Sequence, residues 1–343
     1  MKHEKKKAPT VYDVAKLAGV SPSTVSRFLN RTTYVSSEKS EKLKKAIREL
    51  GYETNQNAVS EGNRRSMTIG VLIQHPDSPF TSRFLNDMEK MLLSLGYSPV
   101  IATGHWQRNL ENDALDYLVK SNVDGMIIVT GNIEEEKIIQ VAQNIPVVAI
   151  GYQVKAPNVC SIQFDNTMGG YLATLHLLQQ GHVNIAHIKG HSGQPDAINR
   201  FEGYKKALAE TGIRYRANLV KQGDFSSELG YEKTVELIES NIHFSAIFAA
   251  NDQTAYGAIK ALTDNGYKVP EDVSVVGFDD LPTSQYFTPA ITTLRQPIEE
   301  VGVICARSII NMLNGDPYET RIPPIDLMVR QSTRSIYEAV KEP

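Results

Sequence analysis

Polar side chains follow short apolar runs in the second half of the chain, at positions where they could recognise a small molecule. Asn251 follows the apolar run 246–250, and Asp279 and Asp280 follow the run 275–278. Amide and carboxylate groups pair with hydroxyls through directional hydrogen bonds, and an aromatic face covers the apolar side of a sugar ring. The same residues also fit as caps of the following helices, and for any one of them alone the cap is the simpler interpretation.

These carboxylates do not indicate catalysis by an acid and a base. Asp279 and Asp280 are adjacent, whereas an acid–base pair flanks the reacting bond from two sides. The sequence contains no P-loop, HExxH, GxSxG or GxGxxG motif, so phosphoryl-transfer, zinc-protease, hydrolase and dinucleotide chemistry lack their usual loops. We therefore expect a protein that is not an enzyme and that has no cofactor.

Histidines and cysteines show no pattern for a metal site. His182, His187 and His191 are spread over a loop, a strand and the end of that strand, so they cannot share one helical face. Cys160 and Cys305 form no CxxC motif and no disulfide framework. We expect no bound metal.

Charge is distributed unevenly along the 343 residues. Residues 1–65 contain 14 Lys and Arg against 7 Asp and Glu, a net charge of +7. The remaining residues carry a net charge of −10, which gives −3 for the whole chain. A basic head on an acidic body predicts that the head alone binds a polyanion. The charged N-terminus and the lack of an apolar stretch near 20 residues predict neither a secretory signal nor a membrane span, so we expect a cytoplasmic protein.

The basic head begins with two short helices. Thr10 and Asp13 form a capping box at the start of the first helix, and Gly19 ends it. Ser21 suits the N-cap of the second helix, and Pro22 suits its first position, where the missing N–H has no partner to lose. This spacing predicts two helices joined by a tight turn.

A third helix over about 37–50 has an apolar face at helical spacing and closes a small core. Two short helices with a closing third predict a helix-turn-helix unit. The second helix presents small polar side chains and Arg27, which can donate two hydrogen bonds to guanine, and the lysines of the third helix can meet phosphates. The alternative is a small helical bundle with a charged, solvated face.

The polar segment 54–66 is the clearest domain boundary, between a head of residues 1–53 and a body of residues 67–343. In the body, short apolar runs alternate with helical patterns, which predicts parallel sheets with helices on both faces. The body is too long for one sheet, so we expect two doubly wound α/β lobes, with a ligand at the strand ends or between the lobes. The expected strands are 67–73, 98–102, 125–129, 147–150, 185–188, 246–249 and 274–278, and the expected helices include 84–95, 167–180, 200–212, 226–241 and 253–266.

The head also carries a family resemblance. Residues 11–30, VYDVAKLAGVSPSTVSRFLN, resemble the head of the lactose-repressor (LacI/GalR) family of bacterial transcriptional regulators. The resemblance implies a three-helix head, a hinge, and a two-lobed body like that of periplasmic sugar-binding proteins. It extends over nearly the whole chain through segments in the family's order: 181–182, 200–204, 223–225, 250–253, 275–280 and 292–297.

The resemblance implies that the head binds double-stranded operator DNA. Three residues are then expected to face bases: Pro22, Ser23 and Arg27. Further residues are expected at or near phosphates: Thr10, Tyr12, Ser21, Thr24, Ser26, Asn30, Tyr34 and Asn55.

The hinge departs from the family pattern. In the family, this segment, which includes Ala58 here, folds into a helix on operator DNA and opens the minor groove with a leucine. Glu61 occupies the leucine position, and a carboxylate cannot fill an apolar gap between base pairs. Either Val59 substitutes for the leucine, or operator binding depends more on the head and on Arg64 and Arg65. The alternative is a flexible tether.

The resemblance further implies an effector cleft and a homodimer formed through the body. Lobe one is expected at about 67–164 plus 297–328, and lobe two at about 165–296. Gly151 stands where some members have an Asp, which leaves room for a larger ligand such as a maltose-type α-glucoside. The residues placed in the cleft are Gln74, Phe80, Arg200, Phe225, Asn251, Asp279 and Gln296.

Together these patterns and the family resemblance, which implies the homodimer and the effector cleft, predict a repressor of sugar-utilisation genes whose operator affinity is controlled by a small sugar. One alternative is a carbon-catabolite regulator, with a phosphorylated carrier protein as corepressor on the surface of the body. An alternative of another class is a sugar-binding transport protein, against which the basic head counts.

The role of Arg27 in reading bases can be tested directly. We expect Arg27→Ala to weaken operator binding by about 1–3 kcal/mol and to relax the preference at one base pair, because a bidentate contact to guanine is lost. Affinities for a set of single-base operator variants measure both effects. Unchanged specificity would contradict the base contact.

Overall fold

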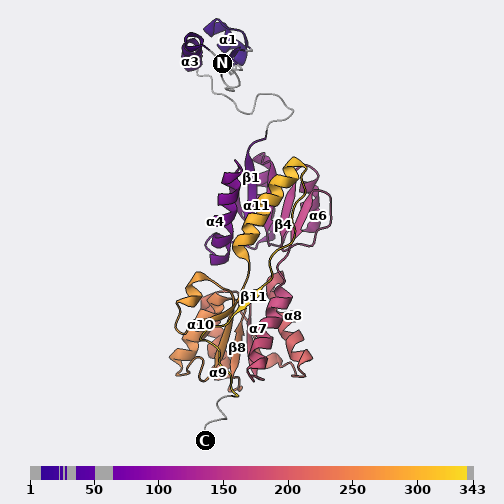
Figure 1. Ribbon diagram of the computed structural model, residues 1–343, viewed down its shortest axis with the longest axis vertical. Coiled ribbons are helices and arrows are strands. Elements are labelled where there is room, and N and C mark those ends of the chain that lie inside the picture. Colours follow the sequence, from indigo (N-terminus) through magenta and orange to yellow (C-terminus); the bar gives the residue numbers. More distant parts are fainter. Residues whose placement is uncertain (1–8, 23, 26–27, 29–35, 51–64, 338–343) are drawn as a thin grey trace, which may run out of the picture. The chain divides into compact units, whose positions relative to one another are not determined.

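The structure is a computed structural model that describes residues 9–22, 24–25, 28, 36–50 and 65–337. It divides into two compact units, a head that ends at Arg64 and a body that begins at Arg65. The body contains two sheets, each covered by helices on both faces (Figure 1). None of the helices in the described ranges is long and apolar enough to cross a membrane.

The first helix of the head is α1 (Val11–Ala18). The side chain of Thr10 accepts a hydrogen bond from the backbone N–H of Asp13, and the Asp13 carboxylate accepts one from the backbone N–H of Thr10 at 2.7 Å. Gly19 ends the helix with a φ of 66°, a left-handed conformation that glycine adopts without a steric penalty. The predicted capping box and glycine stop are confirmed.

The second helical segment begins at Pro22, and the carbonyl of Ser21 accepts hydrogen bonds from the backbone N–H groups of Thr24 and Val25. α3 (Ser37–Leu50) packs against α1. The arrangement is that of the predicted helix-turn-helix head. Its core consists of Val14, Ala15, Ala18, Val25, Leu43 and Ala46.

The predicted DNA contacts fall only partly in the described head. Tyr12 is 73% exposed, Thr10, Ser21 and Pro22 are also exposed, and Thr24 is half-buried. The other calls on the head and hinge lie outside the described residues: Ser23, Ser26, Arg27, Asn30, Tyr34, Asn55, Ala58 and Glu61. All of these DNA contacts stay predictions.

Lobe one is built on a parallel sheet in the order β2-β1-β3-β4-β5. α4 and α11 cover one face and α5 and α6 the other, because alternate residues of β1 pack to opposite sides: Ile69 and Val71 to one, Leu72 to the other. The elements are β1 (Thr68–Ile73), α4 (Pro79–Ser94), β2 (Ser98–Thr103), α5 (Arg108–Lys120), β3 (Gly125–Val129), α6 (Glu135–Ala142), β4 (Val147–Ile150), β5 (Val159–Ile162) and α11 (Ile298–Asn314).

Lobe two has a sheet in the order β11-β10-β9-β8-β6-β7, in which β11 alone pairs antiparallel with its neighbour. α7 and α8 pack on one face and α9 and α10 on the other (Figure 1). The elements are α7 (Asn166–Gln179), β6 (Ile185–Lys189), α8 (Pro195–Glu210), η1 (Ala217–Leu219), β7 (Val220–Gln222), α9 (Ser227–Glu239), β8 (Ala246–Ala249), α10 (Asp252–Asp264), β9 (Ser274–Asp279), η2 (Pro282–Gln285), β10 (Thr292–Arg295) and β11 (Asp326–Met328).

The chain passes between the lobes after β5, after β10 and before β11. The chain returns to lobe two earlier than expected, because residues up to 328 were assigned to lobe one. Asp326–Met328 pairs with β10 in lobe two, and the carbonyl of Ser332 accepts a hydrogen bond from the backbone N–H of Val275 at 2.7 Å. A three-residue strand has no readable period, which is why the sequence did not reveal this return.

The three histidines have separate surroundings. His182 contacts the hydroxyl of Ser245 at 2.9 Å, His191 is exposed beside a cavity, and His187 is buried in β6. In the part of the chain that the structure describes, no group of three His, Cys, Asp or Glu side chains could hold a metal ion. Cys160 and Cys305 are buried free thiols.

His187 provides a test of the lobe-two core. Its ring stacks on Phe248 with centroids 4.6 Å apart, and burial lowers its pKa from 6.5 to about 3. The neutral form is kept in the fold, while the unfolded chain takes up a proton below pH 6.5, so this contribution to stability is lost as the pH falls.

We expect wild type to lose about 2 kcal/mol more unfolding free energy between pH 7 and pH 5 than His187→Phe, which keeps an aromatic ring without a titrating group. Denaturant unfolding at both pH values measures the difference. Equal losses in the two proteins would contradict the neutral, buried histidine.

Candidate functional site

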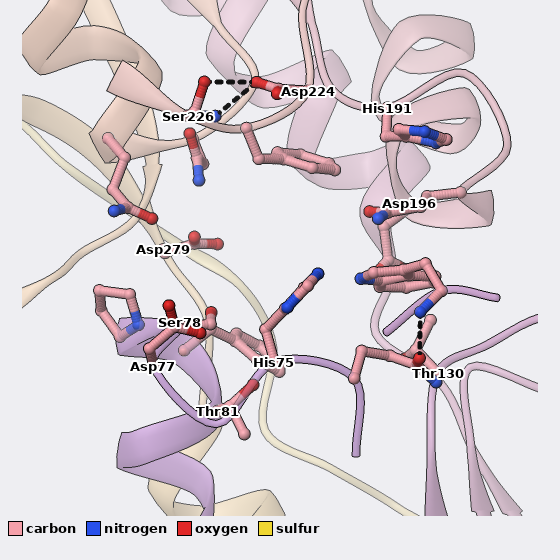
Figure 2. Close-up of a pocket in the computed structure, with 18 of the residues that line it drawn as sticks. His75, Asp77, Ser78, Thr81, Thr130, His191, Asp196, Asp224, Ser226 and Asp279 are labelled. Carbon is pink, nitrogen blue, oxygen red and sulfur yellow. Dashed lines mark hydrogen bonds between the residues drawn. The ribbon is translucent and has the colours of Figure 1, made fainter. Parts of the chain in front are cut away.

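A cavity of about 530 Å³ lies between the two lobes, at the carboxyl ends of several parallel strands. Figure 2 shows its labelled side chains around one open space, with Asp77, Ser78 and Thr81 at the start of α4 on one side. On the other side, lobe two contributes His191, Asp196, Asp224, Ser226 and Asp279. This is where a ligand of a two-lobed α/β body is expected to bind.

Six of the seven residues predicted for the cleft line this cavity: Gln74, Phe80, Arg200, Phe225, Asn251 and Asp279. Gln296 does not line it. Its amide Nε2 instead donates a hydrogen bond to Oδ1 of Asp279 at 2.7 Å, so it acts on the cavity through Asp279. The binding roles of all seven stay predictions.

Asp279 and Arg200 form the buried polar centre of the cavity. They are 5% and 4% exposed, and Nη2 of Arg200 lies 3.6 Å from Oδ1 of Asp279. Burial raises the pKa of the Asp279 carboxyl, and the charge of Arg200 opposes that rise. Among the described residues, Oδ2 of Asp279 has no hydrogen-bond partner, so it can accept a proton donor from a ligand.

Arg200 is fixed on three sides. Its Nε donates to Oδ1 of Asn166 at 2.8 Å, and its Nη1 donates to the carbonyl of Ala250 at 2.6 Å. The guanidinium carbon lies 3.7 Å from the centre of the Phe278 ring. Because these contacts determine the position of the guanidinium, Arg200 positions Asp279 as well as lining the cavity.

The neighbouring carboxylates have structural partners instead. Asp280 accepts hydrogen bonds from Arg295 at 2.7 Å and from Arg330 at 2.6 Å, and it does not line the cavity. Asp252 accepts from the backbone N–H of Leu281 at 2.7 Å, and burial raises its pKa to about 7. Of the three carboxylates at the ends of β8 and β9, which are Asp252, Asp279 and Asp280, Asp279 alone lines the cavity.

Asn251 is the helix cap weighed from the sequence and also lines the cavity, while its role in binding stays a prediction. Its Oδ1 accepts from the backbone N–H of Thr254 at 2.9 Å, which makes it the N-cap of α10, and it also lines the cavity. The interpretation of Gly151 as extra room was wrong. Gly151 does not line the cavity, and a Cβ there would lie 2.8 Å from Oγ1 of Thr130.

Strained backbone gathers at the cavity. His105, Trp106, Phe225 and Asp279 all line it and have φ values of 51°, 57°, 75° and 102°. Each such residue costs roughly 1–3 kcal/mol and persists only where its surroundings hold it, as at ligand sites. No pattern in the sequence marked His105 or Trp106, although Trp106 is the single tryptophan of the chain.

Arg83 of α4 connects lobe one to the strand end that carries Asp279. Its Nη1 donates to the carbonyls of Asp279 and Asp280 at 3.1 Å each. Its Nε and Nη2 donate to the carboxylate of Glu299 at 2.7 and 2.9 Å. The guanidinium therefore ties α4 and α11 to the backbone beneath the cavity.

Two known protein families match this chain, one in the head and one in the body. The model of bacterial regulatory proteins of the lacI family matches residues 10–55, and a periplasmic binding protein-like domain matches residues 174–333. The ribose operon repressor of Halalkalibacterium halodurans is 36% identical over 327 residues, which cover 95% of this chain and 97% of that protein. The chain belongs to the lacI family of bacterial regulatory proteins.

Other members of the lacI family are similar over their whole length. The repressor PurR of Histophilus somni is 30% identical over 331 residues, covering 95% of this chain and 99% of that protein. The crystal structure of the lac repressor dimer bound to operator and the anti-inducer ONPF covers 96% of this chain and 100% of its own, with 30% identity and a TM-score of 0.79. This lacI-family protein is a DNA-binding transcriptional repressor that is regulated by a small-molecule effector.

Two substitutions in α4, at Arg83 and at Lys90, are expected to change the stability of this lacI-family repressor by different amounts. We expect Arg83→Met to lower the unfolding free energy by about 1–3 kcal/mol, because four charge-assisted hydrogen bonds are lost. The matched control is Lys90→Met, whose exposed ion pair with Asp87 contributes less than about 0.5 kcal/mol. Denaturant titrations of both variants test this, and similar losses would contradict the tie between the lobes.

Proposed function

We propose that this protein represses sugar-utilisation genes and that a small sugar in the inter-lobe cavity controls its operator affinity. The observation that carries the proposal is the free Oδ2 of Asp279, held in place by Arg200 and Gln296. A buried carboxylate oxygen is a strong acceptor for a sugar hydroxyl. Phe225 lines the same cavity and offers apolar surface for a sugar ring, while Phe80 lines it in contact with Phe164.

Two helices provide a route from the cavity to the linker. α4 and α11 pack together along their length, and a Cβ at Gly302 would lie 2.7 Å from the carbonyl of Phe84, so only glycine permits this close approach. Arg65 donates to Oδ1 of Asn314, the last residue of α11, at 2.8 Å, and to the hydroxyl of Tyr97, which follows α4 in the chain, at 3.1 Å. Arg65 lies at the end of the polar segment 54–66 and is the first residue of the body unit.

We infer that rearrangement of the lobes around a sugar moves this helix pair and so alters the linker. Operator binding and sugar binding are then linked by a coupling of typically about 1–3 kcal/mol, negative for an inducer. The working form is a cytoplasmic homodimer that places two recognition helices in successive major grooves of a pseudo-palindromic site. The dimeric state of the lac repressor on its operator supports this form.

The identity of the sugar has competing candidates. The relative from Halalkalibacterium halodurans favours ribose, and the aromatic residues of the cavity favour a maltose-type α-glucoside. The PurR relative makes a purine the competing effector class. The surface of the body would be the site of a phosphorylated carrier protein in a catabolite regulator. A sugar panel and a purine panel in an operator gel shift separate these cases.

Adjacent aspartates supply a matched pair of variants for this experiment. We expect Asp279→Asn to reduce the sugar response of the operator complex about 10-fold or more, because a charge-assisted hydrogen bond is worth about 1.5–3 kcal/mol. Operator binding without sugar is expected to persist, while the unfolding free energy falls because Arg200 loses its buried partner. Asp280→Asn, with its contacts to Arg295 and Arg330, is expected to lower stability but to keep the sugar response.

The gel shift measures both variants over a series of sugar concentrations. A normal response of Asp279→Asn would return Asp279 to a purely structural role. Release of the operator by a purine and by none of the sugars would overturn the proposed effector class.

A further inference from the structure

We propose that Trp106 forms an aromatic wall of the cavity on lobe one and selects a sugar of two rings over a single ring. This inference rests on the proposed function, since it takes the effector to be a sugar. It adds a specificity-determining residue and limits the effector to the disaccharide class. Trp106 lines the cavity and is half-buried, so part of its surface is open to a ligand.

The backbone of Trp106 is held in an unfavourable conformation by buried partners. Trp106 and the preceding His105 both have positive φ values, 57° and 51°, which non-glycine residues rarely adopt. The backbone N–H of Trp106 donates to Oε1 of Gln74 at 2.8 Å, and its carbonyl accepts from Nδ2 of Asn132 at 3.0 Å. Gln74, expected to bind the effector, therefore serves as a positioning residue for Trp106.

A second layer supports this loop. The backbone N–H of Asn132 donates to Oε2 of Glu111 at 2.7 Å, and Glu111 is fully buried. The chain of contacts thus runs from a buried carboxylate through Asn132 to the backbone of Trp106. The core of lobe one does not require these contacts, because Trp106 is absent from both of its hydrophobic clusters.

Lobe two offers a counterpart on the opposite side of the cavity. Phe225 also lines the cavity with a positive φ of 75°, and its ring packs so closely on Gly190 that a Cβ there would lie 2.1 Å from it. The ring is also 5.5 Å from the Arg200 guanidinium, beside the polar centre. Phe225 therefore offers its face to the ring that Asp279 would bind.

Two aromatic walls on different lobes suit a ligand with two apolar faces. Phe80, the third aromatic residue, already packs edge-to-face on Phe164 at 5.9 Å between centroids. A cavity of about 530 Å³ falls within the range of sites that enclose ligands larger than one sugar ring. A disaccharide places one ring at Asp279 and Phe225 and the other at Trp106.

The test compares a disaccharide with its own monosaccharide on the full-length protein. Calorimetric titrations with maltose, glucose and ribose are made on wild type, Trp106→Ala, Trp106→Phe and Gln107→Ala. Gln107 is the matched control because it is exposed, adjacent to Trp106 and absent from the cavity lining. As Trp106 is the single tryptophan, its fluorescence in wild type reports directly on contact with each sugar.

We expect wild type to bind maltose at least tenfold more tightly than glucose or ribose, with a change in tryptophan emission for maltose only. Trp106→Ala is expected to lose this tenfold preference while its affinity for glucose stays within about twofold. Trp106→Phe should recover part of the preference, and Gln107→Ala should keep all of it. The recovery by phenylalanine distinguishes loss of stacking from damage to the loop.

Three results would overturn the inference. Equal weakening of maltose and glucose by Trp106→Ala would leave Trp106 a structural role only, and so would unchanged maltose affinity. Tighter binding of ribose than of maltose by wild type would reject the two-ring ligand but keep the proposed sugar-responsive repressor. Binding of a purine with no binding of any sugar would reject the proposed effector class itself.

Discussion

The buried guanidinium of Arg200 is the contact on which the polar side of the cleft depends. Its donors are committed to Asn166 and Ala250, and its flat face lies over Phe278, so it has little freedom to move. Its Nη2 lies 3.6 Å from Oδ1 of Asp279, and the carboxylate of Asp279 is buried beside it. A buried charge without its partner is strongly destabilising, which keeps the two groups together and leaves one carboxylate oxygen for a ligand.

The end of β9, which carries Asp279, is also in contact with the helix pair of lobe one. Arg83 donates to the carbonyl of Asp279, and α4, which carries Arg83, packs with α11 as far as Arg65. A ligand that changes the spacing of the lobes must therefore change the contacts of Arg83 or move α4. Because a close-packed helix pair shifts as a unit more readily than it deforms, we propose that this displacement reaches Arg65, the first residue of the body unit.

The sequence predicted the parts of this structure that have a strong local signal. Strands such as β3 and β8 are continuous apolar runs, and the capping box at Thr10 is a local pattern, so each was predictable. β11 has three residues and no period, and it became visible only through its pairing with β10. The strand-end pattern predicted a cleft but did not distinguish the two adjacent aspartates, and only the family resemblance placed Asp279 there. In the structure Asp280 pairs with Arg295 and Arg330 instead. The conformation of Trp106 depends on partners distant in sequence and could not be predicted.

The central claim is that the cavity and the operator site share one free-energy coupling. The most direct measurement is a pair of calorimetric titrations: operator into protein with and without saturating sugar, and sugar into protein with and without saturating operator. The two affinity ratios must be the same factor, about 5- to 150-fold, because linkage between two binding sites is reciprocal. Equal operator affinities with and without a sugar that binds the cavity would contradict the account.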